Sequence, residues 1–525
     1  VDGIPFRKLR EQTLGAVEQI EVLRGPQGTL YGANTESGLI VIRTRQPTEA
    51  FEGEVTGSAF GFGNGIGGDM RISMGGPLID DRLAASMVTS YSHADSFVRN
   101  LGSSIGEEGE LSEAFVQGKM RWTPSDRVTL DLLAQTSRLR APGLYEQEFL
   151  PIDRAAYDRA YADLFNGGRR AGRFALINDA PKRTAEDEYL LAGNLHVDFG
   201  PAVLDFNASW RSLETNSQGI DLDLTAFPGA AGASSDDETF WNFEARLSSP
   251  VDSRIQWVAG LNHYRSREGQ LLSTLVGPGG LDDYAAAPLQ TSRSRDYAMF
   301  GQLTVPLLEG VRFTAGGRYE RAERDKVQDE GVLDLGALFR IDADNWQEFN
   351  VLVNEQGQAI STNLITSNAN VRSEGFELEV TGRLSAALEL AASFGYVDST
   401  YIDYNFSATQ DFTGNRVRLV PEYDASLAAS WRPWKGLLLR GEVAASGSTP
   451  LNPENTAFQD AVVLIGGQIG WEAERWSARL YVENLTNELV FNTNAFANFA
   501  FGADGTLYAG VAPPRVVGLQ IGFSW

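Results

Sequence analysis

Hydrophobic and polar residues alternate along most of the chain, from about Glu52 to the C-terminus. In residues 311–320, VRFTAGGRYE, apolar or small side chains occupy the odd positions and mostly polar side chains the even ones. The same period of two residues recurs in residues 128–134, 376–381 and 388–396. Alternate residues of a β-strand point to opposite faces. The pattern therefore predicts an all-β chain whose strands each have one apolar and one charged face.

The lengths of the connections separate the two architectures that this alternation allows, a soluble sandwich and a membrane barrel. Tight turns are predicted at one end of the hairpins: Pro77–Asp81, Pro124–Asp126, Gly200–Pro201, Pro250–Ser253, Leu308–Gly310, Leu384–Ala387, Pro433–Gly436 and Glu472–Arg475. Long loops are predicted at the other end: Ser96–Leu111, Arg138–Ala185, Asn216–Asp236, Glu268–Ser292, Val351–Ala369 and Leu485–Ala512. Short turns alternating with long loops are typical of bacterial outer-membrane barrels. We therefore predict a transmembrane antiparallel β-barrel whose charged strand faces line the lumen.

The last segment of the chain fits such a barrel. Apolar residues occupy every second position from Val517 to Trp525, and outer-membrane barrels commonly end on a strand of this kind. An ordinary last strand explains these residues equally well. In a barrel, the lipid-facing residues should be exposed rather than packed in a core: Phe313, Phe394, Leu480 and Leu519.

Composition narrows the class of protein further. Mean hydropathy is −0.22, and no apolar run reaches the roughly 18 residues of a transmembrane helix. The chain has no cysteine, and its histidines (His93, His196 and His263) fall on separate predicted strands without metal-ligand spacing or a G-x-S-x-G elbow. We therefore predict no enzyme activity, no metal site and no cofactor. The net charge of −25 argues against binding of nucleic acid.

One segment near the start of the chain breaks the strand pattern. Residues 17–47 read VEQIEVLRGPQGTLYGANTESGLIVIRTRQP, in which two short apolar runs flank a glycine-rich stretch. Glycines allow close backbone approach and turns in a compact segment. This stretch resembles the end of the plug domain of TonB-dependent receptors, whose pattern is close to V-E-x-I-E-V-L-R-G-P-x-G-x-L-Y-G. The residues of that motif are Arg24, Gly25, Pro26, Gly28, Tyr31 and Gly32.

The resemblance extends through the predicted barrel. It includes Met299–Arg318, Ser373–Asp403, Arg479–Asn487 and Pro514–Trp525. It implies that residues 1–48 are the C-terminal part of a plug domain and that residues 49–525 form the barrel, with the junction within Thr44–Glu54 and Ile20–Arg43 inside the lumen. Receptors of this kind close with 22 strands, of which about 19 are visible in this sequence. We recognise neither a signal peptide nor a TonB box, the short segment that the periplasmic partner captures by strand addition, so the front of the plug is expected to be missing here.

The resemblance implies a function and a location. We expect an outer-membrane receptor of a Gram-negative bacterium that takes up a scarce, bulky solute, by default an iron–siderophore complex, with energy from a TonB-type protein. The alternative is a non-energised binding or scaffold barrel of an outer-membrane complex. Expected partners are outer-membrane lipid, a TonB-type periplasmic energy-coupling protein and other envelope proteins.

The resemblance also implies ion pairs between plug arginines and barrel carboxylates. The candidates are Arg24, Arg43 and Arg45 on the plug, with Glu377, Glu379 and Glu483 on the lumen face. Lumen charges that neutralise one another are the alternative for any single pair. Aromatic residues at the outer ends of strands are candidate ligand contacts, or else belong to an aromatic girdle or to loop packing: Trp346, Phe349, Phe496 and Phe499.

Two loop regions carry further predictions. Asp153–Phe165 predicts a helix with Asp153 as its N-cap, which either orders the longest loop or acts as a lid. The segments Val311–Glu323 and Leu333–Trp346 are both expected to run outward as strands, so an odd number of strands must separate them. We predict that three strands are missing near Val327–Val332, which would raise the count from about 19 to 22.

Overall fold

The fold was obtained as a computed structural model. It describes residues 2–4, 17–24, 38–63, 65–102, 110–141, 149–179, 183–221, 224–227, 230–276, 285–286, 290–308, 311–324, 329–335, 338–353, 359–385, 387–407, 410–493, 495–497 and 507–525.

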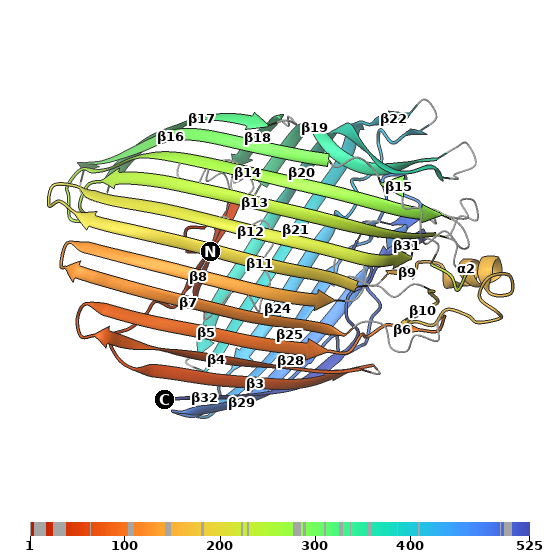
Figure 1. The fold of residues 1–525 in the computed structure, drawn as a ribbon, viewed down its shortest axis with the longest axis horizontal. Helices are drawn as coiled ribbons and strands as arrows, with labels where there is room; N and C mark the ends of the chain where they lie inside the picture. The colour runs from red at the N-terminus through yellow and green to blue at the C-terminus, as the bar shows by residue number, and fades with distance from the viewer. Residues whose placement is uncertain are drawn as a thin grey trace.

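A large antiparallel sheet contains most of these residues (Figure 1). Within the described ranges, its long strands are β3 (Glu52–Phe62), β4 (Gly65–Ile79), β5 (Leu83–Ala94), β7 (Leu111–Ser125), β8 (Val128–Ala141), β11 (Arg183–Asp198), β12 (Val203–Asp221), β13 (Ala230–Ser248), β14 (Gln256–Val276), β16 (Gln290–Leu308), β17 (Val311–Arg324), β18 (Asp329–Leu335), β19 (Leu338–Val353), β20 (Ala359–Ser385), β21 (Leu388–Asp403), β24 (Tyr423–Trp431), β25 (Leu437–Ser446), β28 (Val462–Glu472), β29 (Trp476–Glu483) and β32 (Val516–Ser524).

The remaining elements are short. Two strands near the start of the chain, β1 (Val17–Arg24) and β2 (Gly38–Thr44), form a sheet of their own. Short strands lie in the connections: β6 (Arg99–Asn100), β9 (Phe149–Pro151), β10 (Ala175–Leu176), β15 (Ala285–Ala286), β22 (Asn405–Ser407), β23 (Gln410–Asp411), β26 (Thr449–Pro450), β27 (Phe458–Gln459), β30 (Phe496–Ala497) and β31 (Leu507–Gly510). One connection contains the helix α2 (Arg154–Tyr161). No helix in the described part of the chain is long and apolar enough to cross a membrane.

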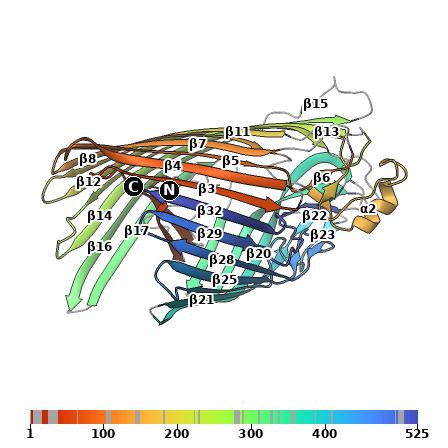
Figure 2. The ribbon, with the colours of Figure 1, turned by 90° about the horizontal axis from the view of Figure 1, so that it is seen from below.

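The long strands pair antiparallel, and the sheet is a closed barrel. The residue-by-residue pairings begin at β18 and continue through β19, β20, β21, β24, β25, β28, β29 and β32. The last strand, β32, also pairs with β3, from which the series continues through β4, β5, β7, β8, β11, β12, β13, β14 and β16 to β17. The strands thus surround a lumen, and Figure 2 shows the same strands from a second direction.

Burial alternates along the strands as the sequence predicts. On β7, Glu113, Gln117 and Lys119 are buried toward the lumen, whereas Val116 and Trp122 are exposed on the opposite face. The four residues predicted to face lipid are exposed: Phe313 at 56%, Phe394 at 38%, Leu480 at 51% and Leu519 at 46%. A soluble sandwich would bury such residues between its sheets. The predicted fold class, a membrane barrel, is therefore confirmed.

Connection lengths sort by end, also as predicted. All eight predicted turns join consecutive long strands at one end, and the short strands and α2 lie at the other (Figure 1). Several predicted loops were too long, however, including Glu268–Ser292, since β14 continues to Val276 and β16 begins at Gln290. Pairing between β12 and β13 continues to Asp221 and Ala231, and pairing between β19 and β20 reaches Val353 and Ala359. Apolar and polar residues do not alternate regularly at these outer ends, so the period of two does not reveal how far the hairpins extend.

The predicted boundary of one strand before the long connection to β20 is wrong. Leu333–Trp346 is not one strand, because β18 ends at Leu335, β19 begins at Leu338, and the two pair antiparallel. Since β18 lies between β17 and β19, it supplies one of the odd number of strands that the expected directions require, and the other two of the predicted three stay a prediction. Alternation continues across this tight hairpin, which hides it in the sequence. The described ranges hold twenty strands of seven or more residues in the barrel, and the absence of further strands near Val327–Val332 stays a prediction.

Close strand contact near the closure of the barrel gives a test of the fold. An alanine Cβ at Gly68 on β4 would lie 2.7 Å from the carbonyl oxygen of Ser58 on β3, whereas one at Gly118 on β7 would meet nothing within 4 Å. Gly68→Ala should cost about 1–3 kcal/mol, as overpacking usually does. Gly118→Ala should stay within about 0.5 kcal/mol of the parent. The temperature at which the folded barrel loses its compact gel mobility measures both, and equal values for the two variants would contradict this packing.

Candidate functional site: the plug segment and its cover

The two strands β1 and β2 form a small antiparallel sheet separate from the barrel. Val17 pairs with Thr44 at one end and Leu23 with Leu39 near the other. The barrel begins after this sheet, with β3 at Glu52. The sheet therefore has its own pairing and is not a stave of the barrel wall.

A buried polar contact ties this segment to the lumen face of β7. The Lys119 ammonium lies 3.0 Å from the Asp2 carboxylate, and the two side chains are only 6% and 10% exposed. Lys119 also donates to the Thr44 hydroxyl. Asp2 in turn accepts from the Thr44 backbone N–H at 2.9 Å and from its hydroxyl at 2.6 Å. We call Asp2, Thr44 and Lys119 the plug anchor, because they join the plug sheet to the wall.

An apolar contact accompanies the plug anchor. Ile4 is 4% exposed and packs against Leu190 of β11 and Phe240 of β13. Both wall residues alternate with exposed neighbours, so they face the lumen. The segment 2–4 thus contacts the inner wall from β7 to β13.

A polar cavity of about 660 Å³ lies beside this contact. Asp2 and Glu49 line one side, and β7, β8, β11, β12 and β13 supply the rest. Three pairs of polar side chains contact each other within its wall: Arg121 with Asp131 at 2.7 Å, His196 with Asp205 at 2.7 Å, and Arg246 with Glu244 at 2.5 Å. The surface of this cavity is therefore hydrophilic and carries both acidic and basic side chains.

A second network, of buried polar side chains, runs along the inner wall of the barrel nearer the long loops. The Arg211 guanidinium is 4% exposed and lies 2.6 Å from Glu188 and 3.7 Å from Glu238. Gln135 donates to Glu188 at 3.2 Å, and Gln117 donates to Gln135 at 2.9 Å. Five strands, from β7 to β13, are linked by these side chains.

The long loops pack together into a cover, which we define by the three-stranded sheet β9–β31–β30 and the helix α2 (Figure 1). β9 follows β8, whereas β31 precedes β32, so the sheet joins two distant loops. Asp153 caps α2 by accepting from the Ala156 N–H at 2.9 Å, which confirms the predicted helix and its cap, although the helix ends at Tyr161 rather than at Phe165. Tyr157 packs with Tyr508, and its hydroxyl donates to the Leu224 carbonyl at 2.7 Å. Burial raises the pKa of Asp179 at the edge of the cover.

A buried carboxylate anchors another loop at the barrel rim. Glu348 on β19 is 1% exposed and accepts from the hydroxyl of Tyr401 on β21 at 2.8 Å. The Arg418 guanidinium lies 2.6 Å from the same carboxylate. Trp346, a predicted ligand contact, donates its indole N–H to Glu348 at 3.1 Å. In this structure, Trp346 therefore helps to hold the buried Glu348 carboxylate.

The other predicted ligand contacts have side chains outside the described residues. The backbone of Phe349 lies in β19 and that of Phe496 in β30, but neither side chain is described. Phe499 lies wholly outside the described ranges. Their contact with a ligand stays a prediction.

The plug arginines whose side chains are described do not contact the predicted barrel carboxylates. Arg43 lies 3.8 Å from Glu21 of the plug itself. The Arg45 side chain is exposed, and only its carbonyl accepts from Lys119, at 3.4 Å. Arg24 ends β1 with a side chain outside the described residues. The rest of the motif (Gly25, Pro26, Gly28, Tyr31 and Gly32) lies outside the described ranges.

The predicted carboxylate partners lie on barrel strands. Glu377 is exposed on β20, between the lipid-facing residues Phe376 and Leu378, and Glu483 is exposed at the end of β29. The side chain of Glu379 is outside the described residues. The structure brings none of the described candidates together, and their pairing stays a prediction.

Sequence reasoning missed the plug anchor because it expected the cation on the plug and the acid on the wall. The observed polarity is reversed, with Asp2 on the plug side and Lys119 on the wall. A signal was present: Lys119 is the only lysine within the strands that the structure describes. A lone lysine on a lumen face needs a partner, since buried unpaired charge is costly.

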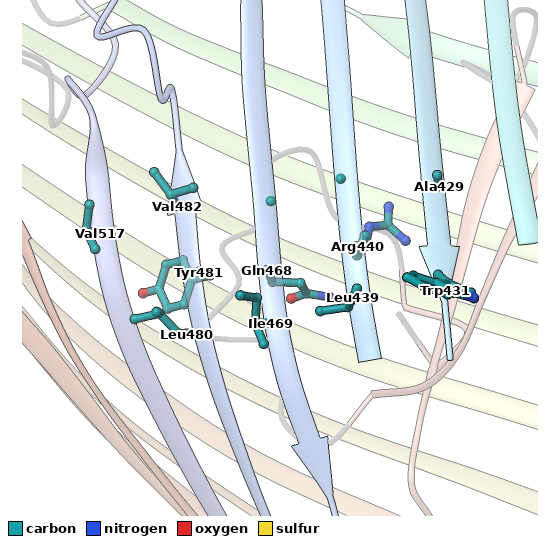
Figure 3. A pocket seen from close by; sticks show the side chains of 12 residues that line it. Ala429, Trp431, Leu439, Arg440, Gln468, Ile469, Leu480, Tyr481, Val482 and Val517 are labelled. Atoms are coloured by element: carbon teal, nitrogen blue, oxygen red, sulfur yellow. The ribbon is translucent and has the colours of Figure 1, made fainter. Parts of the chain in front are cut away.

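A hollow on the outside of the barrel is of another kind. It has a volume of about 510 Å³ and is lined by apolar residues of β24 to β32, among them Trp431, Ile469, Leu480 and Val517 (Figure 3). Because these residues are exposed on the lipid-facing side, this groove is no route for a hydrophilic solute. Among the described residues, no group of three or more metal-ligating side chains occurs either.

The cap of α2 gives a local test of the cover. Asp153→Ala removes the acceptor for the Ala156 N–H and should cost about 0.5–2 kcal/mol of helix stability. Amide hydrogen exchange in residues 154–161 should accelerate accordingly. Asp163→Ala changes an exposed acid beyond the helix and is the matched control. Unchanged exchange in the capping variant would show that packing of the tyrosines alone holds the helix.

A plugged, lipid-exposed barrel with a loop cover defines an outer-membrane receptor. The sequence profile described as TonB dependent receptor-like, beta-barrel, matches residues 121–333 and 325–485. The chain belongs to the TonB-dependent receptor family, whose members are transporters and receptors rather than enzymes and lie in the outer membrane of Gram-negative bacteria.

Individual relatives agree with this assignment. The ferrioxamine B receptor of Salmonella typhimurium is 24% identical over 589 residues, covering 94% of this chain and 80% of that protein. The pesticin receptor of Yersinia pestis is 30% identical over 128 residues, which span 24% of this chain and 19% of that protein. The ferric yersiniabactin uptake receptor of Yersinia pestis has a similar structure, with a TM-score of 0.72 at 17% identity, covering 97% of this chain and 86% of that one. The ferripyoverdine receptor of Pseudomonas aeruginosa gives 0.72 at 14% identity, covering 100% and 79%.

Proposed function

We propose that this chain takes up a bulky ferric chelate across the outer membrane, with energy supplied by a TonB-type periplasmic protein. The observation that carries the proposal is a plug sheet anchored to the inner wall of a barrel whose long loops form a cover. The barrel can then hold a solute between the cover and the plug, and only movement of the plug opens a path. The relatives with printed ligands, ferrioxamine B, yersiniabactin and pyoverdine receptors, support iron chelates as the solute class.

The domain roles follow from the same proposal. Residues 1–48 act as the C-terminal part of the plug, and residues 49–525 form the barrel and its loops. Arg24, Arg43 and Arg45 of the plug pair with carboxylates of the barrel wall, for which Glu377, Glu379 and Glu483 are the candidates. The aromatic side chains of Phe349, Phe496 and Phe499 contact the chelate from above.

The plug anchor gives the energy-coupling step a physical basis. Pulling on the plug must separate the Asp2 carboxylate from the buried Lys119 ammonium, which are 3.0 Å apart. Breaking a buried pair is costly while both groups remain dehydrated. The anchor therefore keeps the plug closed until work is done on it.

A growth experiment tests the proposal against the non-energised alternative. The chain is expressed in a strain that lacks its own ferric-chelate receptors, under iron limitation, with ferrioxamine B, yersiniabactin, pyoverdine or citrate as the sole chelator. Growth on at least one chelate that disappears when the TonB-type protein is deleted is the expected result. Chelate binding to cells without TonB-dependent growth would favour a binding or scaffold barrel, and neither growth nor binding on any chelate would reject iron uptake.

A further inference from the structure

Four arginines form a compact group on the outside of the barrel, on β14 and β16. Arg265 pairs directly opposite Arg295, and Arg267 directly opposite Arg293. All four side chains are exposed. They occupy the outer half of both strands, because β14 runs from the turn after Pro250 toward the long connection that precedes β16. We call them the arginine quartet.

The arginine quartet is unfavourable as it stands. Like charges directly opposite each other on an antiparallel pair destabilise a sheet, and here two such pairs are adjacent. In the described part of the chain, none of the four arginines forms an ion pair. Glu323 is the register neighbour of Arg295 on β17, with a side chain outside the described residues, and one carboxylate balances only one of four charges.

Other exposed arginines at the outer rim of the barrel do form ion pairs within the protein. Arg138 and Arg140 on β8 also lie on the outside at the outer end of their strand. Both contact the Asp187 carboxylate of β11, at 2.6 Å and 3.5 Å. The outer arginines of β8 are thus paired within the protein, whereas those of β14 and β16 form a positive group. This group occurs in a chain whose net charge is −25.

The arginine quartet sits at the outer edge of a band of aromatic residues. His263 stacks on Tyr297 with ring centroids 4.5 Å apart, and Phe243 stacks on His263 at 6.5 Å. His263 lies two positions before Arg265 on β14, and Tyr297 lies two positions after Arg295 on β16. Aromatic girdles mark the boundary between hydrocarbon and headgroups. The four arginines therefore lie at the level of the outer-leaflet headgroups.

An apolar groove leads away from the arginine quartet into the hydrocarbon layer. It has a volume of about 660 Å³, with Leu132, Leu191, Trp210, Trp241 and Phe243 among its lining residues. Small residues, Gly193 and Ala208, form part of its floor. Trp241 pairs directly with Arg265, so the groove opens beside the charged group. A positive site and a lipid-facing groove are thus continuous on one surface.

We infer that this surface binds a phosphate-bearing glycolipid of the outer leaflet, with a phosphate on the arginine quartet and an acyl chain in the groove. Guanidinium groups bind phosphate through paired hydrogen bonds, and a phosphate between the facing arginines removes their repulsion. The inference is independent of the proposed uptake, because the site faces lipid and not the lumen.

Thermal unfolding of the detergent-solubilised full chain tests the inference with bisphosphorylated lipid A, the same lipid after phosphatase treatment, and inorganic phosphate as probes. Lipid A should raise the unfolding temperature of the parent. Arg265→Gln with Arg295→Gln should weaken the apparent affinity for lipid A about 25-fold, at about fivefold for each arginine near an anionic surface. Arg138→Gln with Arg140→Gln, which removes the same charge from the paired part of the rim, should leave that affinity unchanged.

Lipid-free stability distinguishes a binding role from a structural one. Without lipid, the Arg265→Gln and Arg295→Gln double variant should unfold at the same temperature as the parent or higher, because repulsion has been removed. A lower lipid-free temperature would show that the arginines hold the sheet together and would overturn the inference. Equal stabilisation by dephosphorylated lipid, or by inorganic phosphate at the same concentration, would overturn it as well. So would loss of lipid A binding in both double variants alike.

Discussion

Lys119→Met should release the plug segment from the barrel wall. The substitution leaves the Asp2 carboxylate, 10% exposed, without the ammonium that lies 3.0 Å away. Removing one partner of a buried ion pair costs about 3–5 kcal/mol. Protease cleavage at exposed sites of the plug sheet, such as Arg43, should therefore accelerate by about 100-fold or more, since cleavage tracks the population of the open form. Passage of a bulky hydrophilic antibiotic through the outer membrane should rise with it.

Two variants control for this effect. Lys435→Met removes the same charge from an exposed position in the turn between β24 and β25 and should leave cleavage unchanged. Asp2→Asn combined with Lys119→Met removes both charges, and most of the lost protection should return, because neither charge then stays buried alone. Parent-like cleavage in Lys119→Met would mean that other contacts, such as the packing of Ile4, hold the plug by themselves.

Arg211→Met should destabilise the barrel itself. Arg211 is 4% exposed and sits between Glu188 at 2.6 Å and Glu238 at 3.7 Å. Its removal leaves two nearby carboxylates in the wall without their cation, at a cost of about 3–5 kcal/mol. Urea unfolding of the barrel in lipid vesicles, followed by tryptophan fluorescence, measures the change. Arg211→Lys should recover only part of it, because lysine keeps the charge but loses the planar fork.

Arg138→Met is the matched substitution on the outside of the barrel. Arg138 contacts Asp187 at 2.6 Å, yet its side chain is 63% exposed. Exposed ion pairs contribute about 0–1 kcal/mol, so the variant should unfold close to the parent. A similar loss in both variants would show that burial does not set the strength of these pairs.

The sequence predicts the barrel well because its signals are local. Alternation identifies which face of a strand meets lipid, so the exposure of Phe313 and Leu519 follows from the side-chain period alone. Turn residues locate the short ends of the hairpins. Where a hairpin extends beyond the expected boundary, as in β19 and β20, apolar and polar residues no longer alternate regularly and the signal is lost. The tight hairpin between Leu335 and Leu338 is hidden for the opposite reason, since alternation continues through it.

The candidate site is less predictable because its contacts depend on register and on distant segments. Register places Arg43 opposite Gln19 and diagonal to Glu21, so that an acid of its own sheet lies 3.8 Å away. Neither sequence pattern nor spacing gives that register. The joining of β9 to β31 links Leu150 with Ala509, which no local pattern connects. The helix α2 is predictable from sequence, because its cap and its apolar positions lie in one continuous segment.

The pairing of β32 with β3 has a consequence for how the protein is made. Glu54 lies opposite Ser524 across this closure. The barrel therefore cannot close until nearly the whole chain has been synthesised and exported. Until then, β3 and β29 each have an unpaired edge, which is a template for pairing with another chain. Contacts so far apart in sequence also form slowly, because a long loop must be ordered before they stabilise anything. The newly exported chain must consequently be shielded in the periplasm, and a chain cut short before Val516 should accumulate there as aggregate or be degraded.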